Sequence, residues 1–352
     1  MNRALRTWGA LLVAAPLAVV MGTASGAQVV GPRASVDPPV AYSAYRGLPA
    51  VYSLMEALKS SQNMKTIPSS VVGQLAGEPN STYFKDCTAT SGPYVCVFGS
   101  PKSKVTLVVA GDSWAEEWIP ALNQLGVQKH FRVVAYMRDG CNMATGTFYD
   151  TTAKGVDTQC APFRTAAITA INSMSPKPAM VIISEARYWY NPDQSWASDA
   201  EWASAVKTTV AAIHSAKVAV TFGEALSAPG PAQCLSINLT NVAACNTPLS
   251  AQKSATDFGV AGIKAAHALP IGLRIFMCGS TCPDIVATTL IHSDAYHVST
   301  AFSTYATAAL GQILGCGASL GYSNAVTLAL RGPTSSAQHS ACTHYLASNG
   351  EY

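Results

Sequence analysis

The sequence lacks an excess of charge of either sign. It carries 22 lysine and arginine residues against 19 aspartate and glutamate residues over 352 positions. Nucleic-acid binding depends on a surplus of cations that displaces counterions from the phosphate backbone, so this balance argues against a nucleic-acid partner. The sequence also has no internal repeat and no low-complexity tract. Its length suits one large α/β domain with an N-terminal extension.

The sequence also lacks Cys and His residues at the spacing of a metal site. Cys278 and Cys282 lie four residues apart, but no second Cys or His pair has the companion spacing of a zinc site. We therefore expect no metal and no other cofactor. The ten cysteines are even in number, which indicates disulfides in an exported protein. Spacing leaves their connectivity open, and local pairing would join Cys87 to Cys96, Cys141 to Cys160, Cys234 to Cys245, Cys278 to Cys282 and Cys316 to Cys342.

The first 27 residues are predicted to be a signal peptide. Arg3 and Arg6 precede an apolar core over residues 8–21, and Ser25-Gly-Ala27 is a small-residue cleavage site. The core is too short to favour a permanent membrane span, and a retained anchor is the alternative. We expect a protein that is secreted or extracytoplasmic in the cell envelope.

A second segment needs the same membrane test. Residues 298–330 carry no charged side chain, and the segment is long enough to span a bilayer. Its many Ser, Thr, Gln and Asn residues and its four glycines make the hydropathy per residue low. We expect instead a packed helix over 299–314, with Ser299 as its N-cap.

From Lys104 onward, short apolar runs alternate with longer helical segments. This alternation predicts an α/β fold, a three-layer α/β/α sandwich with a parallel sheet of about five strands. The strand-length runs are 105–110, 131–137, 179–184, 217–222 and 273–277, and the helical segments between them are 115–125, 161–174, 199–215 and 250–266. A further helix is expected over 49–60, before this alternation begins. The expected organisation is a signal peptide over 1–27, an N-terminal extension over 28–101, the main domain over 102–316 and a tail packed on that domain over 317–352.

Two short segments far apart in the sequence carry the chemistry. Gly111-Asp-Ser113 directly follows the first apolar run, and Asp294-Ala-Tyr-His297 lies near the C-terminus. A serine nucleophile needs a general base and a carboxylate that orients the base. We therefore predict Ser113 as nucleophile, His297 as base and Asp294 as its orienter. An ordinary turn at Ser113, His292 as the base and an N-cap role for Asp294 are the competing interpretations.

A tetrahedral oxyanion needs hydrogen-bond donors, and the backbone N–H groups of Ser113 and Gly140 are the candidates. Arg187 could add a side-chain donor or hold an anionic part of the substrate, and a salt bridge to Glu185 is the competing role. Aromatic rings near this edge suit stacking on sugars, although core packing is their commoner role. The residues expected to contact substrate are Trp114, Arg187, Tyr188 and Trp189.

With these residues in view, the sequence resembles an SGNH-type hydrolase, and more specifically the extracytoplasmic SGNH domain found fused to membrane acyltransferases that O-acylate cell-envelope polysaccharides. The resemblance covers about residues 87–314. It implies the α/β/α sandwich, the roles given above for the serine, aspartate and histidine, and an oxyanion donor at the glycine after the second strand. Its motifs are Cys96-Val-Phe-Gly99, 109–122 around Gly-Asp-Ser, Arg138-Asp-Gly-Cys141, 181–189, the pair Cys234 and Cys245, and Asp294-Ala-Tyr-His-Val-Ser299.

Two departures from the family pattern stand out. Trp114 occupies the place of the histidine that usually follows the nucleophile, and Ser184-Glu-Ala-Arg187 replaces the Gly-x-Asn-Asp block. The third oxyanion donor is therefore open, with Arg187 as a substitute. Because the sequence contains no fused membrane acyltransferase, we expect the protein to work alone or with a separately encoded one.

The sequence thus predicts an exported serine acylesterase or O-acyltransferase that acts on acyl groups, acetyl first, of cell-envelope glycans. Its substrate would be an acylated glycan or a small acyl ester. The alternative is a non-catalytic glycan-binding or assembly module, which Trp114 and the missing Asn block favour and the intact serine, aspartate and histidine set disfavours. A secreted lipase would need an apolar lid, and only the uncharged segment after Ser299 is a candidate.

Overall fold

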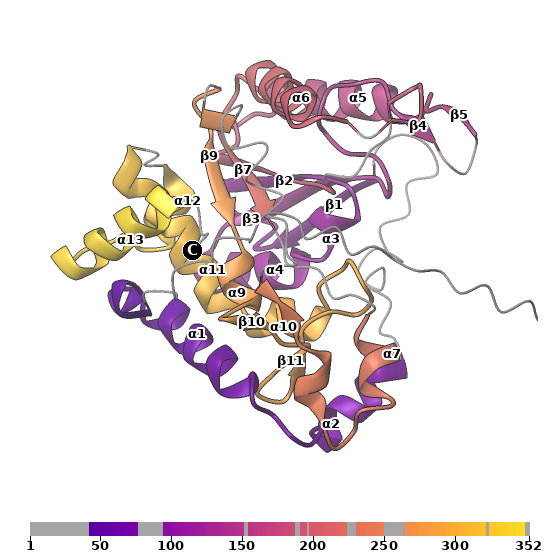
Figure 1. Ribbon diagram of the computed structural model, residues 1–352. Helices are drawn as coiled ribbons and strands as arrows, with labels where there is room; N and C mark the ends of the chain where they lie inside the picture. The colour runs from indigo at the N-terminus through magenta and orange to yellow at the C-terminus, as the bar shows by residue number, and fades with distance from the viewer. Residues whose placement is uncertain are drawn as a thin grey trace, which may run out of the picture. The chain divides into compact units, whose positions relative to one another are not determined.

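The apolar runs of the sequence form a six-stranded sheet in the computed structural model of the chain (Figure 1). Its strand order is β1-β3-β2-β6-β7-β9. The five strands from β3 to β9 are parallel neighbours, and β1 pairs antiparallel with β3 at the edge. The strands are β1 (Tyr94–Gly99), β2 (Thr106–Gly111), β3 (Arg132–Met137), β6 (Met180–Ser184), β7 (Lys217–Gly223) and β9 (Leu269–Gly272).

The structure describes most of the chain outside its N-terminus. The described residues all fall within the unit Asp37–Tyr352. They are residues 42–76, 94–150, 154–186, 191–195, 197–223, 230–249, 263–264, 266–321 and 324–348. The predicted signal peptide, Cys87 and most of the helix expected over 250–266 lie outside them.

Side-chain alternation along the central strands builds two separate cores. In β2, Leu107 and Val109 face one core, while Val108 and Ala110 face the other. All six residues of β2 are buried. A parallel sheet with apolar side chains on both faces needs helices on both faces. The expected three-layer α/β/α sandwich is therefore confirmed.

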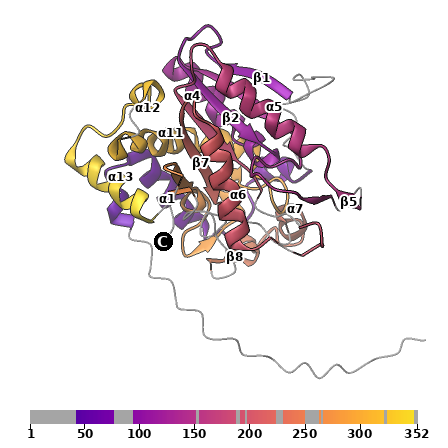
Figure 2. The ribbon, with the colours of Figure 1, turned by 90° about the horizontal axis from the view of Figure 1, so that it is seen from above.

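The helices divide between the two faces of the sheet (Figures 1 and 2). On one face lie α5 (Cys160–Ser173) and α6 (Asp199–Ala212), which cover the core that contains Val108. On the other face lie α1 (Pro49–Ser61), α4 (Ile119–Lys129), α10 (Thr300–Tyr305) and α11 (Thr307–Cys316). The remaining helices include α3 (Ser113–Glu116), α7 (Pro231–Leu235), α9 (Arg274–Met277), α12 (Ala325–Ala329) and α13 (Ser336–Ser348).

The strand order fixes where a site can form. The chain passes from β2 to β3 on one side and then returns to β6 on the other side of β2. The gap beyond the carboxyl ends of β2 and β6 is thus a topological switch point, where open α/β sheets bind their ligands. Ser113 lies two residues after the end of β2, and Glu185 directly follows β6.

Two expected elements differ in the structure. The apolar run 273–277, predicted as a strand, contains the short helix α9, and the last sheet strand is β9 just before it. Short apolar runs in buried strands and buried helices have similar composition, so periodicity does not separate them. The helix expected over 115–125 is two helices, α3 and α4, because Pro120 fits at the start of a new helix and not in a helix interior.

The C-terminal uncharged segment folds into packed helices. Ser299 caps α10, and its hydroxyl accepts a hydrogen bond from the N–H of Phe302 at 3.0 Å. No helix among the described residues is both long and apolar enough to cross a bilayer. The predicted cap at Ser299 is confirmed, and the single helix expected over 299–314 is the pair α10 and α11.

Disulfides join neighbouring segments as local pairing predicts. The structure contains Cys141–Cys160, Cys234–Cys245, Cys278–Cys282 and Cys316–Cys342. Cys96 is also disulfide-bonded. Cys96 lies in β1, within the range 28–101 that the sequence suggested as an extension, and this strand is the edge of the sheet.

Candidate active site

Ser113 is presented by a tight turn between β2 and α3. It is the first residue of α3, and Asp112 caps that helix by accepting the N–H of Trp114 at 3.0 Å. The second carboxylate oxygen of Asp112 accepts the N–H of Ala186 at 2.9 Å, which ties the turn to the end of β6. A Cβ on Gly111 would lie 1.7 Å from the carbonyl oxygen of Ser184, so only glycine fits there.

A short loop near the C-terminus holds Asp294 and His297 together. One oxygen of Asp294 accepts the N–H groups of Tyr296 at 2.7 Å and of His297 at 2.8 Å. Its other oxygen lies 2.8 Å from Nδ1 of His297. The ends of the loop are joined by the Ser293 N–H, which donates to the His297 carbonyl at 2.9 Å. The aspartate therefore fixes both the backbone and the ring of the histidine.

The structure brings Ser113, His297 and Asp294 into one chain of hydrogen bonds. The hydroxyl oxygen of Ser113 lies 2.9 Å from Nε2 of His297, across 184 residues of sequence. Burial alone would raise the pKa of Asp294, but hydrogen bonds from the His297 ring and from two backbone N–H groups outweigh burial and hold the pKa at about 2. An ionised Asp294 favours the His297 tautomer that carries its proton on Nδ1, which leaves Nε2 free to accept the serine proton.

Gly140 lies in the turn after β3, the parallel neighbour of the strand that precedes Ser113. The N–H of Arg138 donates to the carbonyl of Gly111 at 3.1 Å, and the N–H of Cys141 donates to the carbonyl of Arg138 at 3.0 Å. Gly140 itself is exposed, with a φ of 70° and open space around its Cα. Gly140, beyond the carboxyl ends of β2 and β3, therefore stays a predicted oxyanion donor. We define residues 138–144 as the oxyanion loop.

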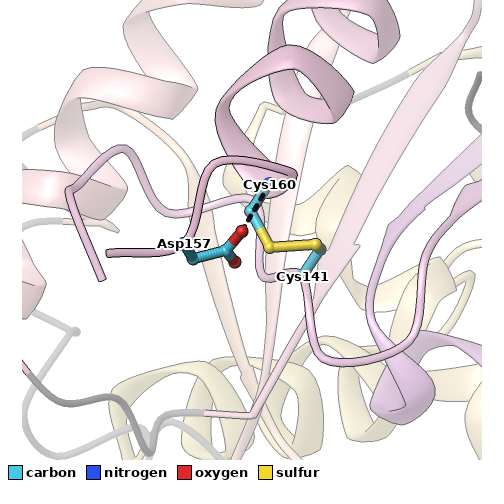
Figure 3. Close-up of side chains that lie close together, drawn as sticks. All are labelled: Cys141, Asp157 and Cys160. Carbon is cyan, nitrogen blue, oxygen red and sulfur yellow. Dashed lines mark hydrogen bonds between the residues drawn. A yellow bond between two sulfur atoms is a disulfide. The ribbon is translucent and has the colours of Figure 1, made fainter. Parts of the chain in front are cut away.

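A disulfide anchors this loop to α5. Cys141 and Cys160 are bonded, and Asp157 lies beside them and accepts the N–H of Cys160 at 3.1 Å (Figure 3). The three side chains lie close enough together to suggest a metal site. Because the two sulfurs are bonded to each other, they are not thiolate ligands. The cluster holds the loop in place.

Two buried side chains with titratable groups, Glu185 and Arg164, hold the rest of the oxyanion loop. The carboxylate of Glu185 accepts the N–H groups of Met143 and, at 2.9 Å, of Ala144. Arg164 donates to the carbonyls of Asn142 at 3.3 Å and Gly146 at 2.7 Å. Burial, with a further contribution from the nearby charge of Asp112, raises the pKa of Glu185 to about 8 despite these hydrogen bonds.

Two consecutive glutamates extend from the end of α3 toward the loops on either side. Glu117 is buried and accepts the N–H of Val298, the residue after His297, at 2.7 Å. Glu116 is also buried, and burial, with a further contribution from the charge of Asp139 in the oxyanion loop, raises its pKa to about 8. Neither residue was predicted from the sequence, and nor was the contact of Glu185 with the oxyanion loop. The sequence shows only two acidic side chains three and four positions after a serine, which is also the pattern of a solvated helix end.

Of the other predicted residues, the structure describes Trp114 and His292. Trp114 is 3% exposed, so its ring packs in the interior and offers no face for a sugar. It lies on a four-residue helix between the sheet and its flanking segments, where a large apolar ring gains more from burial. His292, the competing base, is 1% exposed, and the hydroxyl of Ser113 is hydrogen-bonded to His297 instead. Arg187, Tyr188 and Trp189 lie outside the described residues.

The sequence matches a known family of domains over most of its length. Residues 82–312 match the family described as the SGNH domain fused to AT3 domains. No curated protein matches the sequence. Among solved structures, the chain is similar to the periplasmic domain of a lipopolysaccharide acetyltransferase from Salmonella serovar Paratyphi A. The two are 12% identical with a TM-score of 0.43, and the match covers 74% of this chain and 95% of the other.

Proposed function

Because the chain belongs to the family of SGNH domains that are fused to AT3 domains, we propose that it is an exported serine esterase or O-acyltransferase that acts on acyl groups of cell-envelope glycans. One observation carries the catalytic part of the proposal. The side chains of Ser113, His297 and Asp294 form a continuous hydrogen-bonded chain with distances of 2.9 and 2.8 Å. This arrangement activates a serine hydroxyl, and a pure binding module has no evident need of it.

The proposed reaction proceeds in two halves. Ser113 Oγ attacks the ester carbonyl while Nε2 of His297 takes the hydroxyl proton. The tetrahedral intermediate collapses, the bond to the leaving alcohol breaks, and His297 returns the proton to that alcohol. Water or a sugar hydroxyl then attacks the acyl-serine by the same route in reverse, and Ser113 regains its proton.

The backbone N–H groups of Ser113 and Gly140 are the proposed donors to the oxyanion. In support, Ser113 follows β2 and Gly140 follows β3, which are neighbouring parallel strands, so both residues lie beyond the same edge of the sheet. Donors that the fold has already fixed need no reorganisation as charge develops, and one such donor contributes about 10²–10³-fold in rate. Arg187 remains a candidate third donor.

Tyr296 is a candidate substrate contact that the sequence analysis did not single out. Tyr296 lies between Ala295 and His297 and is 55% exposed. An exposed aromatic ring beside the base suits stacking on a sugar ring. The glycan part of the proposal otherwise rests on the acyltransferase domains to which the family is fused.

The disulfides support an extracytoplasmic location. The described residues contain four disulfides and a ninth bonded cysteine, Cys96, and no cysteine among them is free. Such density of disulfides is typical of oxidising compartments. A signal peptide over residues 1–27 and a separately encoded membrane acyltransferase as partner complete the proposal.

The test uses the purified, oxidised protein and p-nitrophenyl acetate. We expect hydrolysis by the wild type and a loss of at least about 10³-fold in Ser113→Ala, because the nucleophile is removed. Ser60→Ala, an exposed serine in α1, is the matched control and is expected to keep wild-type activity. Equal rates in wild type and Ser113→Ala would contradict the proposal. Added glycan then separates the two activities, since a transferase gives acylated glycan and an esterase gives free acid.

A further inference from the structure

A cavity of about 290 Å³ lies beside α6, on the face of the sheet that α5 and α6 cover (Figure 1). Its lining comes from residues 145–148, directly after the oxyanion loop, from Asn191 in the connection after β6, and from α6. Both connections leave the sheet at the edge where Ser113 lies, because β3 and β6 are the parallel neighbours of β2. The proposed reaction gives this cavity no role.

The wall formed by residues 145–148 is fixed by hydrogen bonds. The N–H of Thr145 donates to the carbonyl of Ala205 in α6 at 3.3 Å. The hydroxyl of Thr145 lies 2.8 Å from that of Thr209, which in turn donates to the carbonyl of Met143 at 2.6 Å. The loop and the helix that line the cavity therefore hold each other in place, as in the pre-formed pockets that bind small molecules.

The floor of the cavity is apolar. Phe148 and Ala205 line it, and both are 6% exposed. Gly146 lies beside them, where a Cβ would come within 2.9 Å of the Phe148 ring, so a residue without a side chain leaves this ring its space. An aromatic ring at the base of a small pocket suits contact with the C–H face of a sugar.

The rim of the cavity is polar. Thr147 and Ser204 are exposed and bring hydroxyl groups to it, and Asn191 and Glu201 add an amide and a carboxylate. Oε1 of Glu201 accepts one long hydrogen bond, from Nδ2 of Asn191 at 3.4 Å. A carboxylate oxygen accepts two hydrogen bonds, so Oε1 can accept another from a hydroxyl group of a ligand.

The charge of the lining restricts the ligand. Among the described residues that line the cavity there is no Lys, Arg or His. Glu201 is ionised at neutral pH, because the hydroxyl and N–H of Ser198 hold its pKa below the ordinary value. Arg164 contacts the Phe148 ring, but its N–H groups are donated to two backbone carbonyls. A phosphate or carboxylate in the cavity would therefore be repelled, whereas a neutral ligand with hydroxyl groups would not.

From this geometry we propose that the cavity is a subsite for one neutral sugar ring, a part of the glycan that stays unchanged while Ser113 reacts with an ester elsewhere on it. The volume is at the lower end of the range for ligand pockets, about 300–1,000 Å³, which suits a single ring. The proposal rests on the proposed function for the ligand being a glycan. Binding of a non-reacting ring would help to position the ester at the serine.

Backbone amide signals of the ¹⁵N-labelled protein test the subsite directly. The probes are the methyl β-pyranosides of glucose, galactose, mannose and N-acetylglucosamine, with that of glucuronic acid as the anionic counterpart. We expect at least one neutral glycoside to shift the signals of residues 145–148 and of α6 around Ser204, and the glucuronide to leave them in place. No shift there with any neutral glycoside, or an equal shift with the glucuronide, would overturn the proposal.

Variants locate the binding by filling the cavity from two sides. Ser204→Trp does so from α6 and Thr147→Trp from the loop, and both positions are exposed, so the fold should tolerate the larger ring. Ala211→Trp is the matched control, because Ala211 is an exposed residue two turns further along α6 and outside the lining. We expect the shifts to be lost in the first two variants and kept in the control. Shifts that persist in both cavity-filling variants would show that the sugar binds elsewhere.

The same protein, assayed with p-nitrophenyl acetate, separates this proposal from the proposed function. Shifts at the cavity in a protein that hydrolyses no ester would leave the subsite in place and contradict the proposed function alone. Ester hydrolysis that is lost in Ser113→Ala, in a protein whose cavity signals respond to no neutral glycoside, would refute the subsite alone.

Discussion

The pH dependence of folding stability offers a direct test of how Glu185 is buried. The pKa of this carboxyl is raised from 4.5 to about 8, first by burial and then by the charge of Asp112. Glu185→Gln keeps the shape of the side chain, and the amide oxygen can still accept the N–H groups of Met143 and Ala144. The variant therefore removes the titration and leaves these loop contacts in place.

The sign and size of the effect follow from proton linkage. A carboxyl group whose pKa is higher in the folded than in the unfolded protein binds more protons when folded, so stability is full below about pH 4.5 and is lost as the pH rises to about 8. With 1.36 kcal/mol for each pKa unit, the wild type should lose about 4 kcal/mol between pH 5 and pH 9 relative to Glu185→Gln. Glu116 titrates in both proteins and cancels in the comparison.

The assay is urea unfolding at several pH values with the disulfides intact. We expect the stability of Glu185→Gln relative to the wild type to increase from pH 5 to pH 9. Glu201→Gln is the control, because Glu201 is exposed and its pKa is lowered by the hydroxyl and N–H of Ser198. If wild type and Glu185→Gln lose stability in parallel, the reasoning is refuted, and Glu185 is ionised in the folded protein with Arg164 as its counter-charge.

Two further predictions concern the turn and the base. Asp294→Asn should lower kcat by about 10²–10⁴-fold, because an amide NH₂ group cannot accept a hydrogen bond from Nδ1 of His297. The loop should keep its fold, since the asparagine oxygen still accepts the two backbone N–H groups. A loss below tenfold in ester hydrolysis would contradict this role. Gly111→Ala should destabilise the protein by about 3 kcal/mol or more, because its Cβ meets the carbonyl of Ser184. Gly140→Ala, which meets no atom within 4 Å, should lose only about 1–2 kcal/mol from its left-handed φ. Equal stability of the two glycine variants in urea unfolding would show that the contact at Gly111 is not restrictive.

The layers of the fold could be predicted from the sequence because periodicity reports burial. The runs that became β2, β3, β6 and β7 were placed to within about a residue, since each is an apolar run of strand length between helical segments. The run 273–277 could not be assigned in the same way. It is buried on all sides as the helix α9, and the strand β9 is equally apolar, so composition does not distinguish them. Only their packing against neighbouring elements does.

The residues of the candidate site also differ in whether the sequence could predict them. Ser113, Asp294 and His297 could be predicted because their chemistry restricts the residue types and because two of them lie three residues apart. Glu117 could not be predicted, since its partner Val298 is 181 residues away and offers only a backbone N–H. Any residue type has such an N–H, so nothing in the sequence marks the pair. Trp114 was expected to contact substrate, with core packing as the alternative, because burial depends on tertiary neighbours that a local sequence pattern does not contain.

The contacts of the histidine loop explain why so short a motif is informative in this fold. Asp294 sets the ring of His297 and the backbone beneath it through local hydrogen bonds, so the acid and base need no distant residue to orient each other. The remaining requirement is to bring that loop to Ser113. Glu117 meets this requirement. It caps the C-terminal end of α3, the helix that begins with Ser113, and it accepts the N–H of Val298, the residue after His297. Nucleophile and base are thereby positioned by one short helix, and an error in strand packing would displace both together.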